Sequence, residues 1–305
     1  MVRFFKKLRT FFDLCKIDKK RVNLFMVYHK PSTLYKNKII TPIHAGREVA
    51  FTGSKDGTMT VDDYQWLEQH MIGDNIKDNI SQKNRFFNEI TVTYWIWKNC
   101  KSPIVGLTHY RRIFDFRNYG NSKDYSDATL KYCIDEKTIK KILSECDLIL
   151  PEKLNFGEQT LYEQYKKHHY ISDLDLALDV IKDKYPQMSK YADGIKEDHS
   201  GYFFNMLICK KDLFNEYAEF LFDVLFEVEK RLPERSERHI YQQRIEAFLA
   251  ERISNIYFNY LIAEKGIRVK EFPVVHLEPE NPVKGFIFKK KTNPRALTIY
   301  LKLRY

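Results

Sequence analysis

Apolar and polar positions follow two different periods along this chain. Short apolar runs bounded by turn residues predict β-strands at residues 22–28, 39–43, 103–109, 147–151, 203–209 and 267–275. Apolar residues at helical spacing predict α-helices at residues 62–71, 83–98, 136–145, 160–193, 211–231 and 239–264. Because strands and helices follow one another in turn, the pattern predicts an α/β fold whose parallel strands are covered by helices.

One predicted strand ends in an unusual polar cluster. The apolar run that starts at Pro103 stops abruptly at His109-Tyr110-Arg111-Arg112. In open α/β sheets, ligands bind in the crevice beyond the carboxyl ends of the strands. Guanidinium groups match the geometry of phosphate oxygens, so two arginines at such a place indicate a phosphate-bearing ligand. The alternative is a pair of solvated surface arginines.

The positive charge of the chain lies at its ends. The net charge is +10; residues 1–21 hold eight Lys/Arg and two Asp, a net of +6, and residues 279–305 hold seven Lys/Arg and one Glu, again +6. The remaining body therefore has a net charge of −2. A nucleic-acid-binding domain is expected to carry its charge on a folded face. We therefore expect no nucleic-acid partner.

The first 21 residues have the pattern of a basic amphipathic helix. Their apolar side chains recur at helical spacing at Phe4, Phe5, Leu8, Phe11, Phe12 and Cys15. Such a helix can lie on an anionic membrane surface, and the run 289–291 of three lysines adds a second basic anchor. The alternative is a helix packed on the domain. With no spanning helix or signal peptide in the sequence, we expect a cytoplasmic protein, peripheral on the inner face of the plasma membrane.

Several common site types are missing from the sequence. Five cysteines are scattered without a C-x-x-C pair, which favours reduced thiols and gives no zinc site. Neither a phosphate-binding loop of the Walker type, nor G-x-G-x-x-G, G-x-S-x-G or H-E-x-x-H occurs. The candidate chemistry is therefore confined to polar residues near the predicted strand ends.

A set of motifs carries a resemblance to a known family. They are Tyr28-His-Lys-Pro31, Asp78-Asn-Ile-Ser-Gln-Lys-Asn84, Glu89-Ile-Thr-Val-Thr-Tyr-Trp-Ile-Trp-Lys-Asn99, Gly106-Leu-Thr-His-Tyr-Arg-Arg112, Asn205-Met206 and Arg244-Ile-Glu-Ala-Phe-Leu-Ala-Glu-Arg252. Together they resemble a bacterial glycosyltransferase family of capsule, exopolysaccharide and O-antigen gene clusters, long classed as a domain of unknown function. Small departures stand at Thr108, Ala247 and Ala250, where the family often has Cys, Gly and Ser.

The resemblance implies a fold and a domain plan. The fold is GT-A-like (Rossmann-like), an α/β mixed sheet flanked by helices, in a single domain at residues 22–277. The basic helix 1–21 precedes this domain, and a basic tail 278–305 follows it. The implied donor is a nucleotide-activated sugar, with UDP-galactofuranose among the donors of relatives.

The resemblance also implies a donor site. Its candidate residues are His29, Asn79, Asn84, Glu89, His109, Tyr110, Arg111, Arg112, Asn205 and Arg244. Metal-dependent GT-A enzymes carry an Asp-x-Asp where this chain has the His109–Arg112 cluster. These cations could stabilise the leaving diphosphate directly, so we expect no required cofactor. The alternative is a divalent metal, Mn²⁺ or Mg²⁺, held by Asp74 and Asp78. Glu89 has the alternative role of a structural partner for an arginine, and Ser81 that of a helix cap.

Transfer to a hydroxyl group also needs a general base. Glu251 is the first candidate, and its alternative role is an ion pair with Arg252 or Arg244. His109 and Asp173 are further catalytic candidates, and Tyr165 and His168 are candidates for the acceptor side. The function expected is transfer of galactofuranose or galactose from a UDP-sugar to a lipid-linked oligosaccharide. The alternative from another class is a non-catalytic nucleotide-sugar-binding scaffold of the same pathway.

Overall fold

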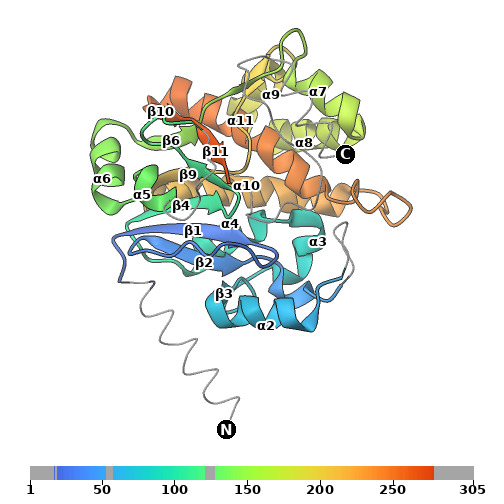
Figure 1. Cartoon of the computed structure of the whole chain (residues 1–305). Coiled ribbons are helices and arrows are strands. Elements are labelled where there is room, and N and C mark those ends of the chain that lie inside the picture. The colour runs from blue at the N-terminus through green and yellow to red at the C-terminus, as the bar shows by residue number, and fades with distance from the viewer. Residues whose placement is uncertain (1–16, 18, 53–57, 121–127, 278–305) are drawn as a thin grey trace.

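The computed structural model describes residues 17, 19–52, 58–120 and 128–277. Within them, a central mixed β-sheet is flanked by helices, as expected for a GT-A-like fold (Figure 1). The main path of the sheet runs in the order β10-β6-β9-β4-β1-β2-β3, and β5 and β11 extend it beside β4. Residues 1–16 and 18 of the predicted N-terminal helix and the whole C-terminal tail 278–305 lie outside the described residues.

One half of the sheet is parallel and deeply buried. All seven residues of β1 (Val22–Tyr28) are buried, as a largely apolar run predicts for a strand covered on both faces. Its parallel neighbours are β2 (Ile40–His44) and β4 (Ile104–His109). The short strand β3 (Ile72–Gly73) pairs with β2, also in parallel. The expected strand-helix-strand pattern is thus confirmed in this half.

The other half contains a reversed strand. β9 (Leu207–Lys210) is antiparallel to both β4 and β6 (Leu148–Pro151). β10 (Val269–Phe272) is parallel to β6, while β5 (Arg112–Phe114) pairs antiparallel with β4 and with β11 (Val274–His276). A separate two-stranded sheet joins β7 (Leu154–Asn155) to β8 (Ser200–Gly201). The fully parallel sheet that alternation alone indicated is therefore wrong, and the mixed sheet is confirmed.

The helices cover both faces of this sheet (Figure 1). Those of the described chain are η1 (Arg47–Val49), α2 (Val61–His70), η2 (Ser81–Lys83), α3 (Asn84–Phe87), α4 (Ile90–Asn99), α5 (Ala128–Lys131), α6 (Glu136–Glu145), α7 (Leu161–His168), α8 (Ile171–Lys184), η3 (Pro186–Met188), α9 (Ser189–Gly194), α10 (Lys211–Arg231) and α11 (Ile245–Lys265). α10 packs against α4, α8 and α11. None of them combines the length and the apolar character that crossing a membrane requires.

Several sequence predictions of element boundaries are wrong. The helix predicted at 83–98 is broken at Asn88, whose φ is 46°. The strand predicted at 203–209 starts only at Leu207, because Phe204 and Asn205 have φ of 76° and 50°. The helix predicted at 239–264 begins at Ile245. The helix predicted at 160–193 is divided into α7, α8, η3 and α9, and the strand predicted at 267–275 is divided into β10 and β11. The first two breaks place polar residues at one edge of the sheet.

That edge collects the ends of several elements. Strand pairing sets Tyr28 beside His44 and Val27 beside His109, so β1, β2 and β4 end together. Leu107 pairs with Leu207, so the antiparallel strand β9 starts where β4 ends. We call this side of the sheet the carboxyl edge.

Candidate functional site

The cationic cluster forms a tight turn at the carboxyl edge. β4 ends at His109 and the chain reverses into β5, with His109 paired to Arg112 and the Thr108 hydroxyl donating to the Arg112 carbonyl at 2.7 Å. Tyr110 is buried and stacks on Tyr28 with ring centroids 5.1 Å apart. The next residue, Arg111, is exposed, so this turn presents a guanidinium beside a fixed aromatic ring.

His109 is held by the turn that precedes β9. Its Nε2 lies 2.7 Å from the carbonyl oxygen of Phe204. Because a carbonyl can only accept, Nε2 carries a proton, and the Nδ1 atom decides whether the ring is charged. The guanidinium of Arg112 lies 5.1 Å from the centroid of the Phe204 ring. Phe204 thus contacts two of the predicted cationic residues.

Glu89 lies among these cations. It precedes α4 directly after the break at Asn88, and its Oε1 accepts a hydrogen bond of 3.0 Å from Asn205 Nδ2. Burial by itself would raise the pKa of Glu89, but the charge of His109, the Asn205 bond and the charge of Arg244 outweigh it and lower the pKa to about 2. Glu89 is therefore a carboxylate at neutral pH.

The turn at residues 203–206 is strained and tied down on both sides. Two successive non-glycine residues with positive φ, Phe204 and Asn205, store backbone strain of about 1–3 kcal/mol each. The Phe204 amide donates to Glu251 Oε1 at 3.0 Å, and the other oxygen of Glu251 pairs with Arg252 at 3.1 Å. Glu251 is buried, and both of its oxygens are used. The structure thus gives it the ion pair with Arg252 and a hold on the turn.

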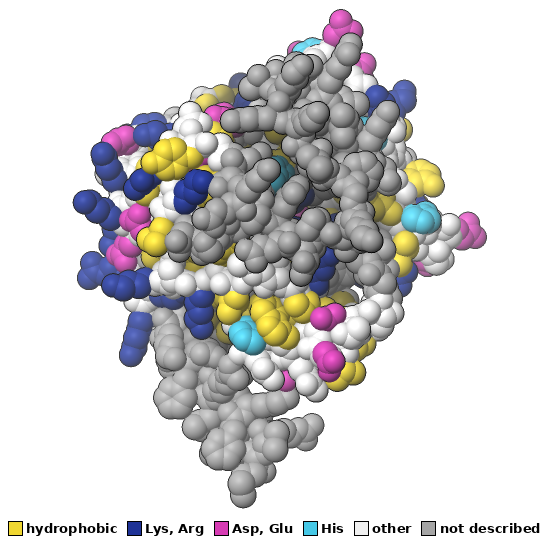
Figure 2. Space-filling model, in the orientation of Figure 1, with side chains coloured by type: hydrophobic (Ala, Val, Ile, Leu, Met, Phe, Trp, Pro, Cys, Tyr) yellow, Lys and Arg dark blue, Asp and Glu magenta, His cyan; other side chains and the backbone are white. Residues whose placement is uncertain are grey.

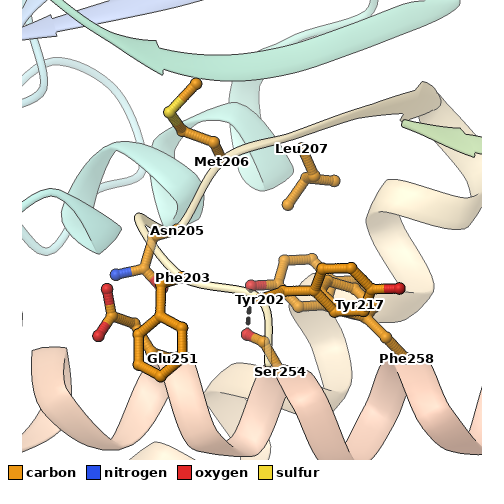
Figure 3. A pocket seen from close by; sticks show the side chains of 9 residues that line it. All are labelled: Tyr202, Phe203, Asn205, Met206, Leu207, Tyr217, Glu251, Ser254 and Phe258. Carbon is orange, nitrogen blue, oxygen red and sulfur yellow. Dashed lines mark hydrogen bonds between the residues drawn. The ribbon is translucent and has the colours of Figure 1, made fainter. Parts of the chain in front are cut away.

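A small cavity lies beneath this turn. Its volume is about 10 Å³, barely enough for one water. Figure 3 shows its lining by Tyr202, Phe203, Asn205, Met206, Leu207, Tyr217, Glu251, Ser254 and Phe258, with the Asn205 side chain and the Glu251 carboxylate together at the end of the turn away from Tyr217. The cavity is too small for a substrate, so it belongs to the support of the turn.

Two more predicted donor-site residues join this group. His29 follows β1, and its ring lies 5.4 Å from that of Tyr110. Arg244 immediately precedes α11, with its guanidinium near the rings of Tyr241 and Phe248, and its charge helps to lower the pKa of Glu89. The structure therefore brings His29, Glu89, His109, Tyr110, Arg111, Arg112, Asn205 and Arg244 to one edge of the sheet.

Asn79 and Asn84 instead shape the loop before α4. Asn79 donates to the Lys77 carbonyl and accepts from the Ser81 amide. Asn84 donates to the Asn88 carbonyl at 2.6 Å and to the Thr91 hydroxyl at 3.1 Å. Both side chains therefore satisfy local main-chain and side-chain groups, and the structure does not add them to the cationic group.

Asp74 and Asp78, the alternative metal ligands, lie in different surroundings. Asp74 is fully buried and accepts from the Ser81 and Thr91 hydroxyls and from the amides of Gly46 and Arg47. Burial raises its pKa despite these bonds. Asp78 is exposed and accepts from Tyr94. Across the residues that the structure describes, no three His, Cys, Asp or Glu side chains group as metal ligands would. Ser81 donates to Asp74 and accepts from the Glu48 amide, so it does not cap the helix that follows it.

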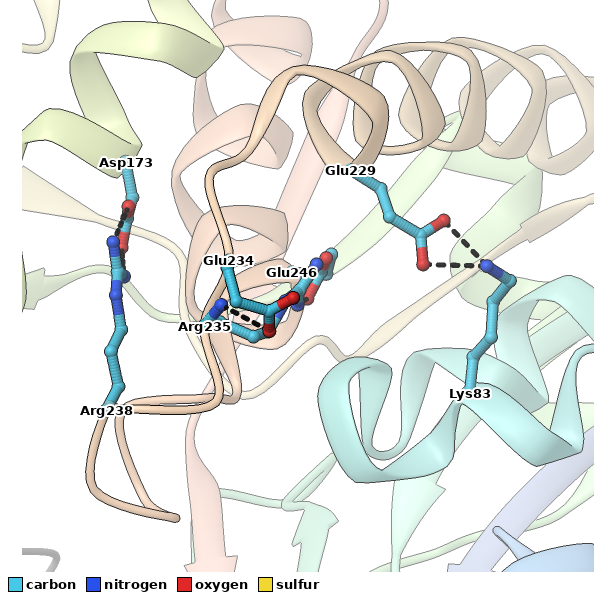
Figure 4. A network of polar contacts seen from close by, with 7 residues as sticks. All are labelled: Lys83, Asp173, Glu229, Glu234, Arg235, Arg238 and Glu246. Atoms are coloured by element: carbon cyan, nitrogen blue, oxygen red, sulfur yellow. Dashed lines mark hydrogen bonds and ion pairs between the residues drawn. The ribbon is translucent and has the colours of Figure 1, made fainter.

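The residues predicted for the acceptor side lie farther along, around α7 and α8. Asp173 forms a bidentate pair with Arg238, at 2.6 and 3.0 Å (Figure 4). Tyr165 is fully buried, and burial raises the pKa of its hydroxyl. Burial lowers the pKa of the half-buried His168, whose carbonyl accepts from Gln242. The Asp173 side chain and the His168 carbonyl therefore hold α8 and α7 to the segment 232–244.

Sequence reasoning missed a buried pair at the end of β2. Arg47 donates from Nε to His44 Nδ1 at 3.2 Å and from Nη2 to the carbonyls of Leu67 and Met71. Burial, the Arg47 charge and His29 lower the pKa of His44 to about 3, so its ring is neutral. The only signal of this pair in the sequence was the place of His44 at the end of a predicted strand. Phe204 was missed because its apolar surroundings look like a strand.

Comparisons with known proteins agree with this architecture. The fold matches the apo structure of the WbbM bifunctional glycosyltransferase with a TM-score of 0.72 and 28% sequence identity. The match covers 86% of this chain and 47% of that one, so this chain spans about half the length of its structural relative. No curated protein matches the chain. The model of the family described as Domain of unknown function (DUF4422) matches residues 23–262, most of the chain, which therefore belongs to this family.

Proposed function

We propose that this chain is a glycosyltransferase that moves a sugar from a UDP-sugar to a lipid-linked oligosaccharide. The observation that carries the proposal is the His109–Arg112 turn, a cationic cluster at the edge where open α/β sheets bind ligands. Its support is the likeness to a glycosyltransferase over 86% of the chain. The resemblance of the sequence motifs favours galactofuranose or galactose as the transferred sugar.

The chemistry expected at this turn is stabilisation of a leaving group. In the transfer step, an acceptor hydroxyl attacks the anomeric carbon, and the bond between that carbon and the diphosphate breaks. Negative charge then grows on the diphosphate. Arg111, Arg112 and His109 would take up that charge with N–H donors fixed in advance, so we propose that no metal is required. Mn²⁺ or Mg²⁺ dependence is the alternative.

The proton of the acceptor hydroxyl goes to a general base. Glu251 remains the proposed base, with Asp173 and His109 as further candidates. Glu251 would serve only after releasing Phe204 or Arg252, and Asp173 only after releasing Arg238. Tyr165 and His168 are proposed for the acceptor side on the resemblance alone.

A donor screen tests the proposal. The full chain is incubated with UDP-galactose, UDP-galactofuranose and other UDP-sugars, with and without excess EDTA, and release of UDP is measured. We expect release from one donor, unchanged by EDTA. Strict dependence on added Mn²⁺ or Mg²⁺ would overturn the metal-free mechanism, and UDP binding without any transfer would identify a scaffold instead.

Variants of the turn test the role of its arginines. Arg111→Ala and Arg112→Ala should each lower the transfer rate about 100-fold, as expected for removal of one donor to a developing anion. Arg117→Ala is the matched control, because Arg117 is an exposed arginine that follows β5. Equal effects of all three changes would show that the turn has no special part in transfer.

A further inference from the structure

A buried acceptor atom at the carboxyl edge has no hydrogen-bond donor among the residues that the structure describes. Asn205 is only 8% exposed, and its Nδ2 is used by Glu89. Its Oδ1 is among the buried side-chain atoms of the described chain that lack a partner. Burying such an atom costs free energy unless a donor arrives. Glu89 beside it is a carboxylate with one oxygen held by Asn205, so two acceptor groups lie side by side.

The carboxyl edge presents two kinds of hydrogen-bonding group. Arg111 and Arg112 are donors, which suit a diphosphate. Asn205 Oδ1 and the Glu89 carboxylate, whose charge His109 and Arg244 balance in part, accept from hydroxyl groups. A UDP-sugar has two matching parts, since its anionic diphosphate is joined directly to a polyol.

The two kinds of group are linked by the strained turn. Phe204 accepts from His109 and packs under Arg112, and Asn205 follows it directly. Glu251 holds the Phe204 amide from below. The positive φ of Asn205 sets the direction of its side-chain amide. The strained backbone of the turn therefore places this side chain next to the cations.

We propose that Asn205 Oδ1 and the carboxylate of Glu89 bind hydroxyl groups of the transferred sugar and so determine donor specificity. The inference rests on the proposed function, because it assumes that the ligand is a UDP-sugar. The two acceptors recognise the polyol, while the affinity for UDP comes from the rest of the site.

Binding to the full chain tests the inference. UDP, UDP-galactose and UDP-galactofuranose are titrated calorimetrically into the wild type, Asn205→Gly and Glu89→Gln. Glycine accepts the positive φ of residue 205 and removes only the side chain. Asn118→Gly is the matched control, since Asn118 also has a positive φ, of 56°, but is exposed.

We expect Asn205→Gly and Glu89→Gln to leave the affinity for UDP within about threefold and to lower the affinity for the better UDP-sugar about tenfold or more, the loss of one or two hydrogen bonds. The control should change neither affinity. Monodeoxy analogues of that sugar give a second readout. The wild type should bind one of them about tenfold more weakly, whereas Asn205→Gly should bind it and the parent equally.

Two results would overturn the inference. One is an equal loss of UDP and UDP-sugar affinity in both variants, and the other is full retention of sugar selectivity. If the wild type binds UDP and the variants give either of these results, the inference is wrong but the proposed function stands. A wild type that binds neither UDP nor any UDP-sugar sinks the proposed function as well.

Discussion

Glu251 holds two groups at once, and its role can be separated from that of a general base. Glu251→Gln keeps an acceptor for the Phe204 amide but sets an amide against Arg252, which loses its charged partner. We expect a loss of stability of about 2 kcal/mol and a fall of both donor affinity and rate, because the turn loosens.

Chemical denaturation, UDP-sugar titration and transfer kinetics check this prediction. Glu219→Gln is the control, because Glu219 is an exposed glutamate of α10. A rate that falls with stability and donor affinity unchanged would contradict the positioning role and establish Glu251 as the base.

His44 gives the folded protein a sensitivity to acid. Its pKa falls from 6.5 to about 3 on folding, so below pH 6.5 the unfolded chain binds a proton that the folded chain does not. The contribution of His44 to the free energy of unfolding is therefore fully present above pH 6.5, and it decreases as the pH falls from 6.5 to about 3. His44→Asn keeps an acceptor for Arg47 and cannot titrate. Between pH 6 and 4.5 the wild type should lose about 2 kcal/mol more than this variant.

Urea denaturation of the two proteins across this pH range makes the measurement, and parallel curves would contradict the prediction. The comparison of the two proteins cancels the contribution of groups that titrate in both.

Single residues were predicted best where a buried run ends. The turn at His109–Arg112 could be placed at a strand end because the apolar run before it predicts a buried strand that stops there. The bond between Asp173 and Arg238 joins positions 65 residues apart and depends on the path of a loop. Patterns of neighbouring residues carry no information on such a pair, so Asp173 could not be separated from a catalytic acid.

Among the elements, the segment 232–244 is tied to its surroundings by buried ion pairs. Arg235 pairs with the fully buried Glu246, and Arg238 with Asp173 (Figure 4). Removing one partner of such a pair leaves a buried charge, at a cost of about 3–5 kcal/mol. The segment ends at Arg244, so these pairs also position a residue of the proposed donor site.

We therefore expect Asp173→Leu alone to destabilise the protein by about 3 kcal/mol. The double variant with Arg238→Met should recover most of this stability, since an apolar pair can replace a buried ion pair at little cost. Thermal unfolding measures the stability of the single and the double variant, and transfer assays measure their activity. If the double variant is stable but inactive, Asp173 has a catalytic role; recovered activity assigns it to structure.

Element boundaries were predicted well wherever periodicity decided them. The helix at Glu136–Glu145 was predicted to the residue, because an Asp135 cap starts it and apolar spacing runs to its end. The break at Phe204 could not be predicted, because it depends on a tertiary bond from the Phe204 amide to Glu251. The break at Asn88 is accompanied by a local bond from the Asn84 side chain to the Asn88 carbonyl, which apolar spacing does not report. Periodicity continues through both breaks and so hides them.

At the scale of the whole molecule, the positive charge is uneven. In the view of Figure 2, Lys and Arg side chains gather along the side where Figure 1 places α6. The described chain starts at Ile17, whose carbonyl accepts from Ser102 just before β4, at the end of the sheet opposite the carboxyl edge. We expect the basic residues of the segment 1–16 to attract the protein to an anionic membrane surface.

Binding to lipid vesicles tests this expectation. Each basic residue near an anionic surface adds about 1 kcal/mol of attraction, so replacing Lys6, Lys7 and Arg9 by Glu should lower the affinity for vesicles containing phosphatidylglycerol more than 100-fold. The control variant replaces Lys166, Lys167 and Lys196 by Glu; these lysines are exposed and lie on or near α7 and α9. It changes the net charge equally but should bind almost as the wild type does. Transfer to a water-soluble acceptor should stay unchanged in both. Equal losses of vesicle binding in the two sets would show that total charge, and not the N-terminal segment, brings the protein to the membrane.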